Sequence, residues 1–249
     1  MPLVSTPAIV LNSMKLGEAD RLITFFTEKR GKIKGVAQGA RRMKSRFGAS
    51  LEPFTHCGLV LFEKGGDKLN RVSQVDITRS FQSLRENLDQ IEMAQQMTHL
   101  VSRLMADEEP NQSVWLLLLE GLTCLEEGIN CKLSTLLFLI RLTTYVGYQP
   151  GWDHCMKCQS LIVREARHFS PTHGGVVCLQ CAETLSSTLS LSAGTLALLK
   201  VAQKMEYRIA HRLRPSSSAI AEITQIYGNH LSHSTGGILS IKTKNWLWI

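Results

Sequence analysis

Two pairs of cysteines constrain the fold of this chain more than any other feature. Cys155 and Cys158 form one C-x2-C pair, and Cys178 and Cys181 form a second pair after a spacer of 19 residues. A two-residue gap lets both thiolates of a pair turn towards the same ion, and two such pairs complete a tetrahedral shell of sulfur ligands. The spacing therefore predicts one structural Zn²⁺ ion. Four sulfur ligands leave no open position for a catalytic water.

The same cysteines also allow two redox-active pairs or disulfides. We expect neither, because the N-terminus shows no basic region followed by an apolar core and a cleavage site, which favours a cytoplasmic, reducing compartment. His154, His168 and His173 lie nearby, but a complete set of four cysteines leaves them no vacant position. The spacer reads as a short hairpin that turns at Gly174 and Gly175. Residues 151–185 are thus interpreted as a zinc-ribbon-like insertion.

Charge is distributed unevenly along the chain. The formal net charge is +7, yet residues 81–130 contain 2 basic and 9 acidic side chains, whereas residues 1–80 contain 14 basic and 7 acidic ones. The densest basic stretch is residues 29–46, with eight Lys or Arg and no acidic residue. Each phosphate that such a stretch contacts releases condensed counterions, and this favours binding of a polyanion. The alternative is a solvated basic loop without a ligand.

We predict that this stretch contacts nucleic acid. Its basic side chains would contact phosphates, and an aromatic ring among them would stack on an unpaired base. The predicted contacts are Lys32, Lys34, Arg41, Arg42, Lys44, Arg46 and Phe47. The other aromatic side chains of this region, Phe25, Phe26, Phe54 and Phe62, are expected mostly in a hydrophobic interior.

The first 80 residues predict short strands separated by turns. Alternating apolar residues and turn residues place these strands at residues 8–14, 21–27, 32–37, 51–62 and 69–77. Five strands within so few residues predict a small closed barrel. A five-stranded oligonucleotide-binding (OB) barrel is the natural candidate, because it combines a basic groove with surfaces on which bases can stack.

After residue 80 the apolar period changes to that of helices. We predict helices at residues 84–104, 113–127, 133–146, 190–211 and 219–230. The chain is therefore expected to be α+β, with an OB-fold DNA-binding domain at residues 1–80 and an α-helical domain at residues 81–249 that contains the insertion. Its apolar windows are shorter than the roughly 18 residues of a membrane span, so no membrane segment is expected.

The motifs of several enzyme classes are absent from the sequence. It contains no phosphate-binding Gly-x4-Gly-Lys-Ser/Thr, no Gly-x-Ser-x-Gly and no His-Glu-x-x-His. A zinc deaminase would need a His-x-Glu beside its C-x2-C pair, and none occurs. We therefore expect a protein that is not an enzyme, although a dispersed set of catalytic residues stays possible.

Several stretches resemble the RecO family of bacterial DNA repair proteins. They are GEADRLITFFT at residues 17–27, RGK at 30–32, VAQGARR at 36–42, LEPF at 51–54, GYQP at 147–150, and the region of the four cysteines with Phe169, Ser170, Gly174 and Gly175. The similarity thus extends over nearly the whole chain. One departure is Gln159, because the family commonly has Gly after the second cysteine.

The resemblance implies a recombination mediator that is active in the bacterial cytoplasm and at the nucleoid during repair. Such proteins bind single- and double-stranded DNA, anneal complementary strands, contact the acidic C-terminal tail of the single-stranded-DNA-binding protein SSB, and act with RecR to load RecA. Some members of the family lack the cysteines, which implies that the metal serves folding. The alternative from another class is a zinc-ribbon adaptor that binds proteins and whose basic barrel binds RNA or DNA.

Overall fold

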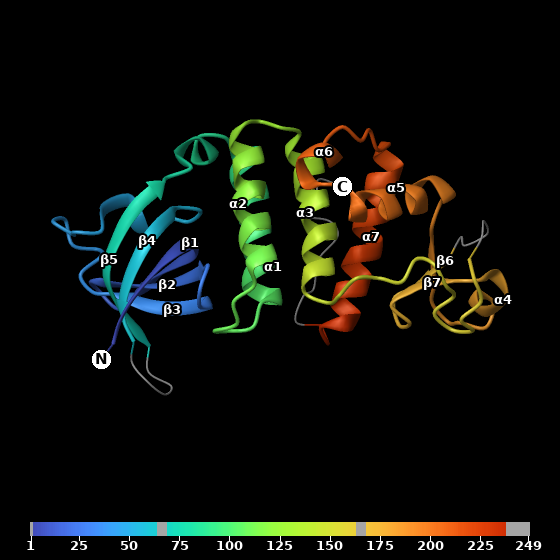
Figure 1. Cartoon of the computed structure of the whole chain (residues 1–249), viewed down its shortest axis with the longest axis horizontal. Coiled ribbons are helices and arrows are strands. Elements are labelled where there is room, and N and C mark those ends of the chain that lie inside the picture. Colours follow the sequence, from blue (N-terminus) through green and yellow to red (C-terminus); the bar gives the residue numbers. More distant parts are fainter. Residues whose placement is uncertain (1, 64–68, 163–167, 238–249) are drawn as a thin grey trace. The chain divides into compact units, whose positions relative to one another are not determined.

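The computed structural model describes residues 2–63, 69–162 and 168–237 (Figure 1). The chain divides into two compact units, Met1–Cys131 and Lys132–Ile249. The first contains the barrel and two helices, and the second contains the other helices and the cysteine region. The predicted domain boundary at residue 80 stays a prediction, since the last strand of the barrel ends at Arg79 but the compact unit continues to Cys131.

The first unit is built on a closed five-stranded barrel. Its strands are β1 (Leu3–Leu16), β2 (Asp20–Thr27), β3 (Gly31–Ala37), β4 (His56–Phe62) and β5 (Asn70–Arg79). They follow the order β1-β2-β3-β5-β4, and β1 also pairs with β4 to close the barrel. The β3–β5 pair is parallel and the other pairs are antiparallel. This order is that of an OB fold, which confirms the predicted fold class.

Alternate residues of the strands fill the barrel. Ile23 and Phe25 of β2 and Ile33 of β3 point inward and are buried with Leu59 and Val72. Residues between them, such as Leu22 and Thr24, therefore face outward. Burial of this apolar set stabilises the barrel by roughly 25 cal/mol for each Å² removed from water.

The loop between β3 and β4 differs from the prediction. A strand was expected from residue 51, but a 3-10 helix covers Gly48–Leu51 and β4 begins at His56. The cause lies in Phe54, whose positive φ of 74° turns the chain out of the extended conformation. The backbone still pairs with β1 there, because Phe54 N donates to Val10 O at 2.8 Å.

Two helices of the first unit cover part of the barrel. They are α1 (Leu88–Leu104) and α2 (Gln112–Glu126). The ring of Trp115 lies 6.4 Å from that of Phe26, which is fully buried although it points away from the barrel interior. Helix α1 begins four residues later than predicted, because the side chain of Asn87 accepts hydrogen bonds from Asp89 N and Gln90 N and caps the helix there.

The second unit consists of helices and a small sheet. Helices α3 (Cys131–Tyr145), α5 (Ala193–Lys204), α6 (Tyr207–Ala210) and α7 (Ser217–Ser234) form its larger part. A three-stranded sheet of β6 (His168–Ser170), β7 (Gly175–Val177) and β8 (Leu189–Ser190), with the short helix α4 (Leu179–Ala182), forms the rest. β6 and β7 are the two strands of the predicted hairpin.

The prediction of one long helix over residues 190–211 was wrong in its length. Ser192 caps the start of the helix, since its Oγ accepts a hydrogen bond from Thr195 N. The helix ends at Lys204, because Met205 is extended, and α6 starts only at Tyr207. No Gly or Pro marks this break; it is fixed by tertiary contacts such as the bond from Tyr207 Oη to Ser134 O at 2.8 Å. Among the described residues, no helix has the length and apolar character needed to cross a membrane.

Two glycines of the first unit allow a clean test of the packing at the barrel edge. Gly17 and Gly31 both have a positive φ, but a Cβ on Gly31 would lie 2.1 Å from Glu109 O, whereas nothing lies within 4 Å at Gly17. Gly17→Ala should lower the free energy of unfolding by about 1 kcal/mol, through backbone strain alone. Gly31→Ala should lower it by about 3 kcal/mol, through strain and overlap together. Urea unfolding measures both, and equal losses would contradict the close approach.

Candidate nucleic-acid interface and metal centre

The loop after β3 presents the predicted basic stretch. Residues Arg41, Arg42, Lys44 and Arg46 are exposed, and none of them forms a salt bridge with any described acidic residue. Their positive charge is thus available to an external anion. Lys29 lies at the opposite end of the β2–β3 hairpin, in the turn between Thr27 and Gly31.

Hydrogen bonds hold the first part of this loop in place. Arg41 donates from one guanidinium nitrogen to Gly17 O and Glu18 O, each at 2.9 Å, and its backbone N donates to Ala19 O. These bonds hold the loop against the β1–β2 turn. Arg41 therefore positions the loop as well as carrying charge, which the sequence pattern did not reveal.

Phe47 holds the other end of the loop, and here the prediction of base stacking needs a correction. Its side chain is only 4% exposed and belongs to the core of the barrel. A base could stack on this ring only if the ring left the core. The Arg46 guanidinium lies 4.9 Å above the ring. We therefore assign Phe47 a packing role.

The predicted phosphate contact of Lys32 also needs a correction. It faces the helices because it pairs with Phe26 in the β2–β3 ladder. Its Nζ donates to Ser102 O at 2.7 Å and lies 3.1 Å from Asp107 Oδ1, and the side chain is 13% exposed. A phosphate contact would require both interactions to break. Lys34, two residues on, is 48% exposed and lies 3.9 Å from the same carboxylate, so it stays a candidate.

The outer face of β1–β2–β3 contributes residues that the sequence analysis missed. Met14 pairs with Leu22 and Leu22 with Val36, so the three side chains form one row across the strands. Met14 is 55% exposed, and Leu22 and Val36 are half-buried. This apolar row lies on the part of the face that α1 and α2 leave open. The sequence contained a sign of this row. Apolar residues occupy inward and outward positions of β2 alike, which indicates a strand with two apolar sides.

The four predicted metal ligands come together in the second unit. The sulfur atoms of Cys155, Cys158, Cys178 and Cys181 all lie within 4.8 Å of one another. Cys158 Sγ and Cys178 Sγ are 3.8 Å apart. Sulfur atoms at the ~2.3 Å bond length of a tetrahedral zinc site are separated by roughly this distance. The cluster can therefore hold one metal ion, and the donor set is one that Zn²⁺ prefers.

Protonation of the cysteines follows from their surroundings. Burial raises the pKa of Cys155, but backbone N–H groups of Cys158, Cys178 and Lys157 outweigh burial and lower that pKa to about 6. Burial, followed by the neighbouring sulfur atoms, raises the pKa of Cys181 to about 12. A fourth negative charge among thiolates is unfavourable without a cation. A divalent ion supplies that cation and lets all four sulfurs deprotonate.

The three nearby histidines lie outside the cysteine cluster. The cluster contains the four cysteines and none of the three histidines nearby. His154 is exposed, and His173 Nδ1 lies 3.0 Å from Ser170 Oγ. Of the other cysteines, Cys57 and Cys124 are buried and Cys131 is half-buried.

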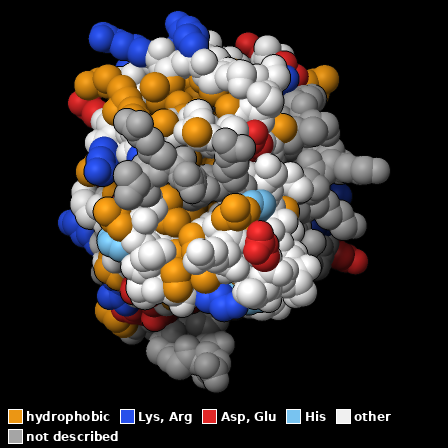
Figure 2. Space-filling model, turned by 90° about the vertical axis from the view of Figure 1, so that its right-hand side faces the viewer, with side chains coloured by type: hydrophobic (Ala, Val, Ile, Leu, Met, Phe, Trp, Pro, Cys, Tyr) orange, Lys and Arg blue, Asp and Glu red, His pale blue; other side chains and the backbone are white. Residues whose placement is uncertain are grey.

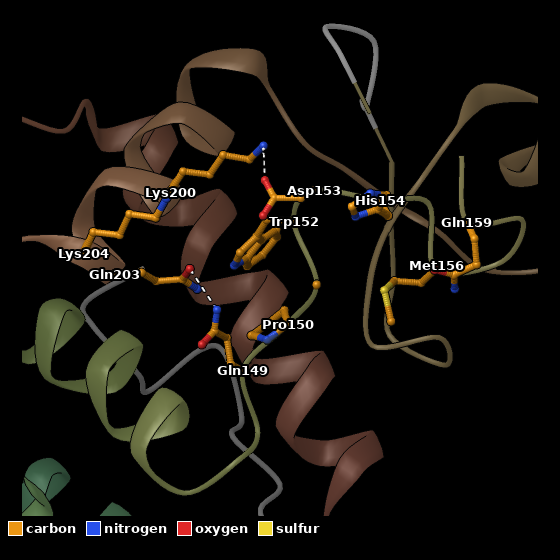
Figure 3. Close-up of a pocket in the computed structure, with 11 residues that line it drawn as sticks. Gln149, Pro150, Trp152, Asp153, His154, Met156, Gln159, Lys200, Gln203 and Lys204 are labelled. Atoms are coloured by element: carbon orange, nitrogen blue, oxygen red, sulfur yellow. Dashed lines mark hydrogen bonds and ion pairs between the residues drawn. The ribbon is translucent and has the colours of Figure 1, made fainter. Parts of the chain in front are cut away.

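A hollow of about 300 Å³ lies beside the first cysteine pair (Figure 3). Two polar contacts cross from the segment before the cysteines to α5: Asp153 Oδ1 to Lys200 Nζ at 2.8 Å, and Gln149 Nε2 to Gln203 Oε1 at 3.2 Å. Lys200 is thus neutralised by a carboxylate. These contacts join the cysteine region to the helices of its own unit.

Apolar side chains also reach the surface of the second unit. Figure 2 shows orange patches between polar areas on the face that it presents. Exposed large side chains of this unit include Leu161 at 65%, Leu179 at 54% and Val201 at 45%. Leu161 and Leu179 are close in sequence to the metal ligands.

The fold and the two sites define a class of protein. It has an OB barrel with a basic loop, followed by a helical unit with a cluster of four cysteines that can hold a metal ion. The family model "Recombination protein O N terminal" matches residues 1–81, and "Recombination protein O C terminal" matches residues 85–242. The chain therefore belongs to the RecO family of DNA repair proteins.

Individual relatives agree with this assignment. "DNA repair protein RecO" of Nocardioides sp. is 35% identical over 223 residues, which cover 86% of this chain and 90% of the relative. The protein of the same name from Symbiobacterium thermophilum is 33% identical over 226 residues, covering 90% and 88%. That of Anaeromyxobacter sp. is 33% identical over 199 residues, covering 80% and 78%.

The departure at Gln159 leads to a prediction about stability. Gln159 has a φ of 63°, in the left-handed region that glycine adopts without strain, and its N donates to Cys155 O at 2.8 Å. Gln159→Gly should therefore raise the free energy of unfolding by about 1 kcal/mol. Gln159→Ala, which keeps the Cβ, should raise it little. Thermal unfolding of the metal-loaded protein measures both, and equal effects would contradict the strain.

Proposed function

We propose that this chain is a recombination mediator that binds single- and double-stranded DNA and anneals complementary strands. The observation that carries the proposal is the loop of residues 38–46 on an OB barrel. It presents four cations that form no salt bridge with a described residue, and it lies beside an open apolar row. Cations contact phosphates of any sequence, while the apolar row can pack against bases. The resemblance to RecO adds action with RecR in loading RecA and contact with the SSB tail.

Annealing follows from the physical chemistry of such a surface. Two strands repel each other through their phosphates, and cationic side chains reduce this repulsion when they replace counterions. Strands held by their backbones keep their bases free to pair. None of these steps needs hydrolysis of a nucleotide, which agrees with the missing phosphate-binding motif in the sequence.

The test is the rate at which the protein anneals two complementary oligonucleotides coated with SSB, without any nucleotide added. We expect acceleration by the unmodified protein and its loss in Arg42→Ala/Lys44→Ala. Arg42 and Lys44 suit this test better than Arg41, because Arg41 also holds the loop in place. The variant should also flatten the dependence of log K on log salt by about 0.7 for each lost contact to a single strand.

Lys29→Ala is the matched control, because it removes a cation from the other end of the same hairpin. It should leave the annealing rate unchanged. An equal loss in both variants would mean that net charge matters rather than the loop. Tight DNA binding without any acceleration would instead favour a basic module of a protein-interaction adaptor.

We further propose that Cys155, Cys158, Cys178 and Cys181 hold one structural Zn²⁺ ion. Metal analysis of fresh protein should find about one zinc per chain, and Cys178→Ser should lose it. Because binding free energy at such a site is folding free energy, a strong chelator should lower the melting temperature of the second unit. Cys124→Ser, which alters a buried cysteine outside the cluster, should retain the metal. Much less than one zinc would contradict the proposal.

A further inference from the structure

A pocket of about 320 Å³ lies in the first unit between β1 and α1. It is separate from the apolar row and from the metal cluster. Its volume is at the lower end of the range of small-molecule sites. Its apolar walls are Leu11, Phe54 and Ile91, and polar groups of Asn12, Glu52 and Gln95 also line it.

Two irregularities of the backbone create this pocket. The β1–β2 register shifts between Val10 and Asn12, so that Leu11 is the extra residue of a bulge. Phe54 has a positive φ, which is uncommon for a bulky side chain. Bulges and strained residues of this kind recur beside binding sites, where they direct side chains that a regular strand would place elsewhere.

The charge of the pocket favours a neutral ligand. Arg85 and Glu52 both line it. An anion would therefore be repelled by Glu52, and a cation would be repelled by Arg85. Arg85 is held in place by bonds to Pro53 O at 2.6 Å, Thr55 Oγ1 at 3.0 Å and Ser80 O at 2.8 Å. Asn12 and Gln95 are exposed to solvent, and within the described residues their side-chain amides form no hydrogen bond with another protein group. Each amide can both donate and accept, as the edge of a nucleobase does.

The position of the pocket connects it to the basic loop. Glu52 lies 3.1 Å from Arg21, and Arg21 pairs with Ala37, the last residue before that loop. Asn12 pairs with Thr24 on the outer face of the barrel, next to the row that begins at Met14. A strand whose phosphates contact the loop would therefore pass the mouth of the pocket.

We propose that this pocket accepts one unpaired nucleobase from a bound DNA strand. The inference rests on the proposed function and adds selectivity to it. A base in a duplex is stacked and paired on both sides, so it can enter only after extrusion. The pocket therefore favours single-stranded DNA, whereas the cations of the loop bind single strands and duplexes alike.

The experiment compares three probes of equal length: a thymidine strand, a fully abasic strand and a duplex. The variant is Asn12→Leu/Gln95→Met, which keeps side-chain size and removes the hydrogen-bonding groups. The unmodified protein should bind the thymidine strand at least about five-fold more tightly than the abasic strand. The variant should reduce this ratio at least about three-fold and leave affinity for the abasic strand and the duplex unchanged.

Gln112→Met is the matched control, because Gln112 is an exposed glutamine of the same unit that lies outside the pocket. It should leave all three affinities unchanged. An unchanged ratio in the double variant, with its fold intact by circular dichroism, would overturn the base pocket while the loop interface stands. If Arg42→Ala/Lys44→Ala left binding of the abasic strand and the duplex unchanged, the loop interface itself would fail.

Discussion

The packing of α1 and α2 onto the barrel decides what the first unit can bind. Gly31 admits the backbone of Glu109, Lys32 bonds to Ser102 O and Asp107, and Phe26 lies under Trp115. These contacts cover one end of the outer face of β1–β2–β3. They leave the other end open, together with the loop that Arg41 holds against the β1–β2 turn. The open surface is therefore apolar along the strands and cationic at the edge.

Such a surface combines two kinds of attraction with different selectivity. The cations act on phosphates, which are the same in every strand, so they give affinity without regard to sequence or strandedness. In the proposed complex, the apolar row and the neighbouring pocket would act on bases, which a duplex keeps stacked and paired. A protein with both can hold two strands near each other and still favour unpaired segments. This is the physical requirement of annealing.

The cysteine region of the second unit is short and has little hydrophobic core, so it needs another source of stability. The hairpin β6–β7 has three residues in each strand, and the apolar cluster around Cys155 is small. A metal ion held by the four sulfurs, as proposed above, would replace much of the missing core. Gln159, the residue after the first cysteine pair, adopts the left-handed conformation that glycine adopts without strain.

The sequence by itself determined the parts that depend on local pattern. The cysteine spacing predicted the sulfur cluster, and the alternation of apolar residues predicted the barrel. The tertiary structure decided which charges and rings are available. Lys32 and Phe47 looked like their neighbours in the basic stretch, yet one lies under a helix and the other fills the barrel. Composition fixes the charge of a segment, but only packing between distant segments fixes which side chains stay in water. The open row and the pocket between β1 and α1 could therefore not be predicted from the sequence.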